Sequence, residues 1–311
     1  MPEARAKPPL SWILATEYPA TNISGVGLYA FAGELQARLD GAEIEIVTDR
    51  PGLTSQTIVQ LAADAHIAGG DVYASALSGI DPVFAIPALP FQTRSIEHAY
   101  ALLNRCLPLY EAAFRRLGHT FLFATVWPAT GLWSDRPIEN IASLKALKIR
   151  TNDPNSAHVF RHIGVDASYM PFADAVALLK RGQLNAVLTS GDGGAGQKLW
   201  DYLGHFTPLN YAIPCSFAFV ANWAMETLTP AQAAHVHAAA AGAQQMQAAG
   251  LKDRISANFD RMRQHGVTIA RHAPADALAI LRDAGSTLSA QWTQPLGAGV
   301  QAALAKSQIE S

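Results

Sequence analysis

Residues 147–190 read LKIRTNDPNSAHVFRHIGVDASYMPFADAVALLKRGQLNAVLTS, and this stretch decides the fold. Apolar, strand-like runs occupy 148–152, 167–172 and 185–190, and a helix-like segment lies in each interval. Strands that alternate with helices are typical of α/β folds with a mainly parallel sheet. The stretch therefore predicts one complete α/β unit.

The sequence on either side of this stretch predicts a second unit. Before it, strand-like runs at 10–15, 44–49 and 71–77 alternate with helical segments, and the nearly all-apolar strand 119–127 is expected to be central. After it, a long apolar strand at 210–224 returns the chain to the first unit. We predict a two-domain α/β fold whose parts are 10–128 with 212–250, 129–211 with 251–295, and a C-terminal helix or tail at 296–311.

A long helix is predicted from Thr229, a candidate N-cap, to about residue 264. At about 1.5 Å per residue such a helix is roughly 50 Å long, which exceeds one small domain. We therefore expect it to span both domains, with bends at Gly242 and Gly250.

The composition excludes some classes of function. A formal net charge of −2 gives no dense basic face, so no nucleic-acid partner is expected. No apolar run approaches the roughly 18 residues of a membrane span. Cys106 and Cys215 lie far apart in apolar settings, which favours two buried free thiols. The N-terminal MPEARAKPPLSWIL has no signal-peptide core, so the protein is either cytoplasmic or a mature chain without its leader.

Residues 189–196, TSGDGGAG, contain the spacing G-x-G-x-x-G directly after a strand. In dinucleotide-binding proteins an acidic residue follows roughly 20 positions later, whereas Ser216 stands in that region here. Two other interpretations stay open: a flexible turn, or a loop whose backbone lies against a ligand.

The sequence contains little that indicates a metal site or a catalytic nucleophile. His158 and His162 share a helix face but lack a third ligand, and no G-x-S-x-G motif occurs. We therefore predict no metal, no cofactor and no catalytic residue.

Arg150 is the strongest candidate binding residue. It ends the apolar run Leu147-Lys148-Ile149, and ligands of α/β units bind at the carboxyl ends of strands. The guanidinium fork can hold a carboxylate through two parallel hydrogen bonds. On position alone, an ion pair with Asp153 is an equally good explanation.

Four segments together resemble the substrate-binding proteins of tripartite ATP-independent periplasmic (TRAP) transporters. They are AIPALPFQTRSIEHAYALL (85–103), RPIENIASLKALKIR (136–150), IGVDASYMPFADAVALLKRGQLNAV (163–187) and NWAMETLTPAQ (222–232). The resemblance covers roughly 10–265. It implies two α/β domains around a cleft, joined by a long helix, in a periplasmic, non-enzymatic and monomeric protein that closes on a ligand and passes it to membrane subunits.

The resemblance also implies roles for individual residues. Arg150 matches the arginine that binds the ligand carboxylate, Phe172 an aromatic that packs on the ligand, and Thr189 a polar cleft residue. Thr130 stands where sialic-acid-binding relatives have a second arginine, which argues against sialic acid. Further candidates at strand ends or in first loops are Trp127, Ser190, Glu17, Tyr18, Ser75 and Asn152.

The predicted function is therefore capture of a small organic acid. Core packing for Trp127 and a solvated loop charge for Glu17 remain alternatives. An enzyme or a cytoplasmic ligand sensor on the same scaffold is the alternative function.

Overall fold

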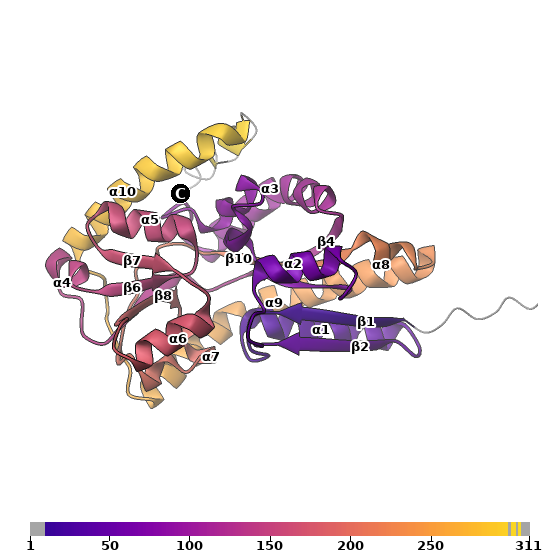
Figure 1. Ribbon diagram of the computed structural model, residues 1–311, viewed down its shortest axis with the longest axis horizontal. Coiled ribbons are helices and arrows are strands. Elements are labelled where there is room, and N and C mark those ends of the chain that lie inside the picture. Colours follow the sequence, from indigo (N-terminus) through magenta and orange to yellow (C-terminus); the bar gives the residue numbers. More distant parts are fainter. Residues whose placement is uncertain (1–9, 298–299, 303, 306–311) are drawn as a thin grey trace, which may run out of the picture. The chain divides into compact units, whose positions relative to one another are not determined.

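Two β-sheets organise the chain in the computed structural model, which describes residues 10–297, 300–302 and 304–305 (Figure 1). The N-terminal residues on which the prediction about a leader rests lie mostly outside this range. Part of the predicted tail at 296–311 also lies outside it. The first sheet has the order β2-β1-β3-β10-β4 and the second the order β11-β9-β5-β8-β6-β7. The two-domain α/β prediction is confirmed.

The strands of the first sheet are β1 (Ser11–Thr16), β2 (Glu43–Thr48), β3 (Gly69–Tyr73), β4 (His119–Val126) and β10 (Cys215–Ala221). The helices next to these strands in the sequence are α1 (Ile23–Arg38), α2 (Ser55–Ala63) and α8 (Asn222–Glu226), and the segment between β3 and β4 contains the 3₁₀ turns η1 (Ala74–Leu77) and η2 (Pro82–Ala88) and the helix α3 (Ile96–Arg116). Strand β1 runs parallel to β2 and β3. Leu28, Phe31 and Leu35 are buried on one face of α1, as their spacing predicts.

The expectation that strand 119–127 is central is wrong. Strand β4 lies at the end of the sheet order, and β10 takes the inner position beside it. Its apolar residues are explained by aromatic packing: Phe121 lies 5.9 Å from Phe114 of α3, and Phe123 lies 6.0 Å from Phe31 of α1, between ring centroids. An edge strand whose side chains pack on two helices therefore has the composition of a central one.

Contacts divide the chain into two compact units. The first contains residues up to Val72, Phe114–Thr125 and Phe217–Gln247, and the second contains the remainder. This division places 73–113 in the second unit, whereas the sequence prediction places it in the first domain. The reason is local packing, because Phe91 N–H donates to Tyr211 O at 2.7 Å and the two rings pack edge to face.

The strands of the second sheet are β5 (Thr130–Ser134), β6 (Lys148–Thr151), β7 (Asp166–Tyr169), β8 (Ala186–Ser190), β9 (His205–Thr207) and β11 (Thr268–Ile269). The helical segments here are α4 (Ile141–Lys145), α5 (Pro154–His162), α6 (Phe172–Lys180), α7 (Gly191–Gly196), α10 (Ala275–Thr293), η3 (Leu199–Asp201) and η4 (Gln294–Leu296). Strand β6 is parallel to β7 and β8, but β5 is antiparallel to β8 and β9.

Helices cover both faces of this second sheet. In Figure 1, α5 and α10 lie on one side of β6–β8, and α6 and α7 lie on the other. The core under α5 and α10 includes Leu132, Ile149 and Leu188, whereas the core under α6 contains Trp133 and Val187. Neighbours in sequence therefore point to opposite faces, as the period of two along a strand requires.

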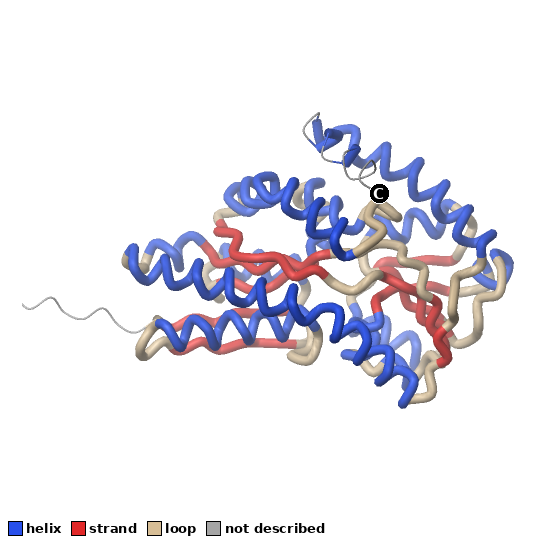
Figure 2. The backbone as a smooth tube through the Cα atoms, turned by 180° about the vertical axis from the view of Figure 1, so that it is seen from behind, coloured by secondary structure: helices blue, strands red, loops and turns tan. Residues whose placement is uncertain are grey.

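The predicted long helix is α9 (Pro230–Gln264), which Figure 2 shows as one continuous helix. Its residues up to Gln247 belong to the first unit and those from Ala248 to the second. The prediction that one helix contributes to both domains is confirmed. Within the described ranges, no helix is both long and apolar enough to cross a lipid bilayer.

The glycine segment after β8 is a short buried helix, so neither a flexible turn nor a loop describes its backbone, and its contact with a ligand stays a prediction. Ser190 caps α7 by accepting a hydrogen bond from Gly193 N–H at 3.1 Å. A Cβ atom at Gly193 would overlap Thr189 Oγ1, and one at Gly194 would overlap the Trp133 indole. The glycines therefore allow a helix to pack directly on β8 and β5.

Both cysteines are buried, as predicted, and neither is in a disulfide. Burial raises the pKa of the Cys106 thiol to about 11 and that of Cys215 to about 12. Both side chains are therefore neutral at physiological pH.

Candidate functional site

Arg150 lies near the carboxyl end of β6, and its side chain is fixed by the neighbouring segment. Its Nε–H donates to Met170 O at 2.9 Å, and its Cζ lies 4.9 Å from the centroid of the Phe172 ring. The residue is only 6% exposed. The guanidinium is thus oriented by a carbonyl and an aromatic face in a largely desolvated position.

Strand pairing places Thr189 on the same face as Arg150. Arg150 pairs with Val187 of β8, and Thr189 is two residues further along that strand. Side chains two residues apart on a strand share a face, and this face is the one covered by α6 and α7. The structure therefore brings together Arg150, Phe172 and Thr189.

Thr130 lies on the opposite face of the same sheet, and Ser190 lies at the end of β8, where α7 begins. Thr130 pairs with Ser190 across β5 and β8, in register with the core pair Leu132 and Leu188. Ser190 Oγ serves as the cap of α7, and Ser190 O accepts a hydrogen bond from Trp133 Nε1–H at 3.2 Å. The sheet therefore separates Thr130 from Arg150, whereas Ser190 Oγ is occupied by the capping hydrogen bond from α7.

A second polar group surrounds Asn152, just beyond β6. Asn152 Nδ2 donates a short hydrogen bond to the hydroxyl of Tyr73, at the end of β3. The Tyr73 ring packs edge to face on Trp127, whose Nε1–H donates to Ser216 Oγ at 3.2 Å. Tyr73 was missed by the sequence reasoning, because the predicted strand 71–77 places it inside the strand, whereas β3 ends at Tyr73. The predicted site residue Ser75 is buried in η1.

Asp153 is a buried carboxyl group beside these residues. It caps α5 by accepting hydrogen bonds from Ser156 N–H and Ser156 Oγ–H, both at 2.8 Å. Burial nevertheless raises its pKa above the usual 3.8, and burial also raises the pKa values of Tyr73 and Tyr211. The helix cap gives Asp153 a structural role of its own.

The raised pKa of Asp153 predicts a pH-dependent stability. The folded state favours the protonated Asp153 carboxyl. Its contribution to the free energy of unfolding is therefore complete below pH 3.8 and is lost as the pH rises through the pKa of the folded state. Asparagine caps helices well and carries no charge. In urea titrations, Asp153→Asn should therefore gain stability relative to the wild type as the pH rises from about 4 to 7. A difference that is constant over this range would contradict the raised pKa.

Glu17 and Tyr18 belong to the first unit. Glu17 Oε1 accepts hydrogen bonds from Ser55 N–H at 3.1 Å and from Ser55 Oγ–H, at the start of α2. Tyr18 N–H lies 3.4 Å from Thr16 Oγ1. The contacts of Glu17 tie the loop after β1 to α2, which is a structural role that the sequence reasoning did not consider.

A buried ion pair joins α7 to α9. Asp192 is 1% exposed and accepts hydrogen bonds from Arg254 Nε–H at 2.5 Å and Asn258 Nδ2–H at 2.8 Å, both from α9. The carboxylate near the first turn of α7 is therefore satisfied by the protein. Among the described residues, no cluster of three His, Cys, Asp or Glu side chains could hold a metal ion.

A protein-family comparison matches most of the chain. The model described as "Bacterial extracellular solute-binding protein, family 7" matches residues 15–292. A search of curated proteins finds no significant match.

Solved structures share the fold along nearly the whole chain. The extracytoplasmic solute receptor DctP7 of Bordetella pertussis, which binds pyroglutamic acid, has a TM-score of 0.89 at 23% identity over 96% of this chain and 98% of that chain. A pyroglutamate-specific TRAP solute-binding protein from a marine metagenome has a TM-score of 0.88 at 22% identity, covering 97% and 99%. A TRAP periplasmic solute-binding protein of Haemophilus influenzae with bound L-gulonate has a TM-score of 0.86 at 14% identity, covering 97% and 100%.

Proposed function

Because the chain belongs to bacterial extracellular solute-binding protein family 7, we propose that it captures a small organic acid outside the cytoplasm for a TRAP transporter. Membership of this family makes solute binding its role. The periplasmic location, the delivery of the ligand to membrane subunits, the lack of catalysis and a monomeric state are parts of the proposal. The relatives named above bind pyroglutamate and L-gulonate, both of which carry a carboxylate, and this supports an acid as the ligand.

The observation that carries the proposal is the fixed, desolvated guanidinium of Arg150. With Nε held by Met170 O and one face covered by Phe172, the group has little freedom to lose when a carboxylate binds. A charge-assisted hydrogen bond is also stronger in such a poorly hydrated place. We assign the ligand carboxylate to Arg150 and the adjacent apolar part of the ligand to Phe172.

The neighbouring polar groups favour an acid that also carries a hydrogen-bond donor. Asn152 Oδ1 is buried and has no hydrogen-bond partner within the described part of the chain, while its Nδ2 is bound to Tyr73. A buried acceptor without a partner destabilises a protein unless a ligand satisfies it. We therefore assign a ligand hydroxyl or N–H group to Asn152, with Thr189 as a further polar contact.

The remaining predicted residues have secondary roles in this proposal. Trp127 is buried and packs edge to face with Tyr73, so we assign it the support of Tyr73. Thr130, Ser190 and Ser75 support the site from the strand and turn that carry them. We assign Glu17 and Tyr18 the role of shaping the loop that follows β1.

A ligand screen tests the proposed function. Thermal-shift measurements should show stabilisation by one or more small carboxylic acids that carry a hydroxyl or N–H group near the carboxylate. Titration calorimetry should then give at least about tenfold weaker binding for the primary amide of the same acid, because the charge-assisted bond is lost. Equal affinity for the acid and its amide would contradict the assignment to Arg150. Chemical turnover of the bound acid would favour the enzyme alternative instead.

A further inference from the structure

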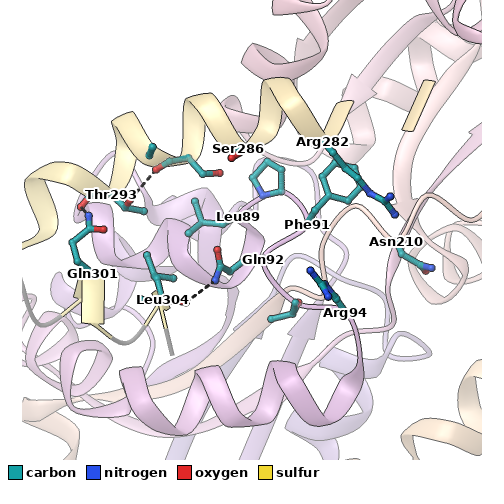
Figure 3. Close-up of a pocket in the computed structure, with 15 residues that line it drawn as sticks. Leu89, Phe91, Gln92, Arg94, Asn210, Arg282, Ser286, Thr293, Gln301 and Leu304 are labelled. Carbon is teal, nitrogen blue, oxygen red and sulfur yellow. Dashed lines mark hydrogen bonds between the residues drawn. The ribbon is translucent and has the colours of Figure 1, made fainter. Parts of the chain in front are cut away.

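A second pocket lies in the second unit, between α10 and the segment 89–94 that connects η2 to α3 (Figure 3). Its volume is about 840 Å³, within the range of about 300–1,000 Å³ that is usual for small-molecule sites. Its walls also include Asn210 and the C-terminal residues Gln301 and Leu304. Neither the predicted function nor the family comparison uses this pocket.

The pocket is separate from the site around Arg150. Helix α10 packs Leu281 and Leu288 into the core that contains Leu132 and Ile149. That core lies on one face of the second sheet, whereas Arg150 and Thr189 lie on the opposite face. A ligand in this pocket would therefore leave Arg150 available for a different molecule.

One end of the pocket is cationic. Figure 3 shows Arg94, Arg282 and Asn210 at this end, with Phe91 beside Arg282. The Arg282 Cζ atom lies 5.6 Å from the centroid of the Phe91 ring. Within the described ranges neither arginine forms an ion pair with a carboxylate. Two guanidinium groups that have no carboxylate partner among the described residues favour an anion between them.

The other end combines apolar side chains with hydroxyl groups. Leu89 and Leu304 line it, and Ser289 of α10 contributes a buried Oγ atom that has no hydrogen-bond partner among the described residues. Gln92 Nε2–H donates to Leu304 O at 3.2 Å, which ties this wall to the segment 89–94. The apolar body of a small molecule would match the two leucines.

The backbone of the pocket is held in an uncommon conformation. Phe91 and Asn210 have φ values of 55° and 50°, in the left-handed region that bulky residues rarely adopt. The hydrogen bond from Phe91 N–H to Tyr211 O at 2.7 Å holds Phe91 against the residue that follows Asn210. Conformations of this kind persist where the surrounding structure fixes them, and they are concentrated at ligand sites.

We propose that this pocket binds an amphiphilic organic anion, a monocarboxylate whose charged group lies between Arg94 and Arg282 and whose apolar body lies against Leu89, Phe91 and Leu304. The concave shape and the volume favour a small molecule over a protein segment. This second site binds independently of the primary ligand and does not require the assignment of Arg150 to be correct.

Binding of 4-phenylbutyrate to the full chain tests the proposal. Calorimetry should show saturable binding that Arg94→Gln and Arg282→Gln each weaken at least about tenfold, because each removes a charge-assisted hydrogen bond. The neutral alcohol 4-phenylbutanol should bind at least about tenfold more weakly than the acid for the same reason. Ser289→Leu fills the pocket without a change of charge and should abolish binding.

The controls separate this site from the primary one. Arg271→Gln removes an exposed arginine elsewhere in the same unit and should leave the affinity for 4-phenylbutyrate unchanged, as should Arg150→Ala. Thermal melts of the two pocket variants should match the wild type, since Arg94 and Arg282 are exposed. The proposal is overturned if 4-phenylbutyrate does not bind, if the alcohol binds equally well, or if only Arg150→Ala removes the binding.

Discussion

Replacement of Arg150 by alanine is expected to weaken binding of the organic-acid ligand by at least about 2 kcal/mol, roughly a 30-fold increase in Kd. The loss is large because the arginine is 6% exposed, so water cannot replace it as a partner for the carboxylate. Titration calorimetry with the best acid from the ligand screen measures the effect. Most of the change should appear in the dissociation rate.

Two variants sharpen this experiment. Arg150→Lys keeps the charge but loses the planar fork and its stacking on Phe172, so it should restore only part of the affinity. Arg136→Ala removes an exposed arginine that pairs with Asp135, and it should bind as the wild type does. An Arg150→Ala variant with unchanged affinity and an unchanged melting curve would exclude Arg150 as the carboxylate-binding residue.

Replacement of Gly194 by alanine is expected to destabilise the protein by about 3 kcal/mol, at the upper end of the range for overpacked cores. A Cβ atom at this position would overlap the indole of Trp133, which is fully buried and hydrogen-bonded to Ser190 O. The indole cannot move aside without breaking that bond. Urea-induced unfolding, followed by circular dichroism, measures the loss.

The matched control is Gly250→Ala in α9. The structure gives a Cβ atom at Gly250 open space, and alanine in a helix interior is more stable than glycine by about 0.5–1 kcal/mol. The two substitutions are chemically identical and should have opposite signs. If Gly194→Ala also stabilised the protein, close packing would not be the reason for the glycines in α7.

Much of the fold could be predicted from the alternation of strand and helix patterns. The pattern of residues 147–190 predicts three strands of the second sheet and the two helices between them in the correct order. It does so because the apolar residues of each element recur with the period of a strand or a helix. The position of β4 could not be predicted in the same way. Its apolar residues fit a central strand and an edge strand covered by Phe31 and Phe114 equally well, and only tertiary packing decides between them.

The glycine segment shows a different limit of the sequence. Gly191, Gly193 and Gly194 have low helix propensity, so a local reading predicts a loop. The helix forms because Ser190 caps it and because close approach to Trp133 and Thr189 requires the absence of a Cβ. Both partners come from strands whose pairing is not visible in the local sequence.

The candidate site could be predicted in part. Arg150 was selected from its place near the end of a strand, and Asn152 follows the same strand. The separation of Thr130 from Arg150 could not be predicted, because it depends on the antiparallel register of β5 against β8. Tyr73 contacts Asn152 across 79 positions of sequence, and no local pattern indicates that pairing.

The order of strands in the first sheet has a consequence for the folding of the chain. Strand β10 lies between β3 and β4 in that sheet, yet it is residues 215–221, the last of the five strands in sequence. During synthesis the sheet cannot be completed until the ribosome has made two thirds of the chain. Pairing over such long separations carries a large loop-closure entropy and slows folding. The nascent chain therefore keeps the edge of β3 exposed for a long interval, and this favours its capture by chaperones while it is still unfolded.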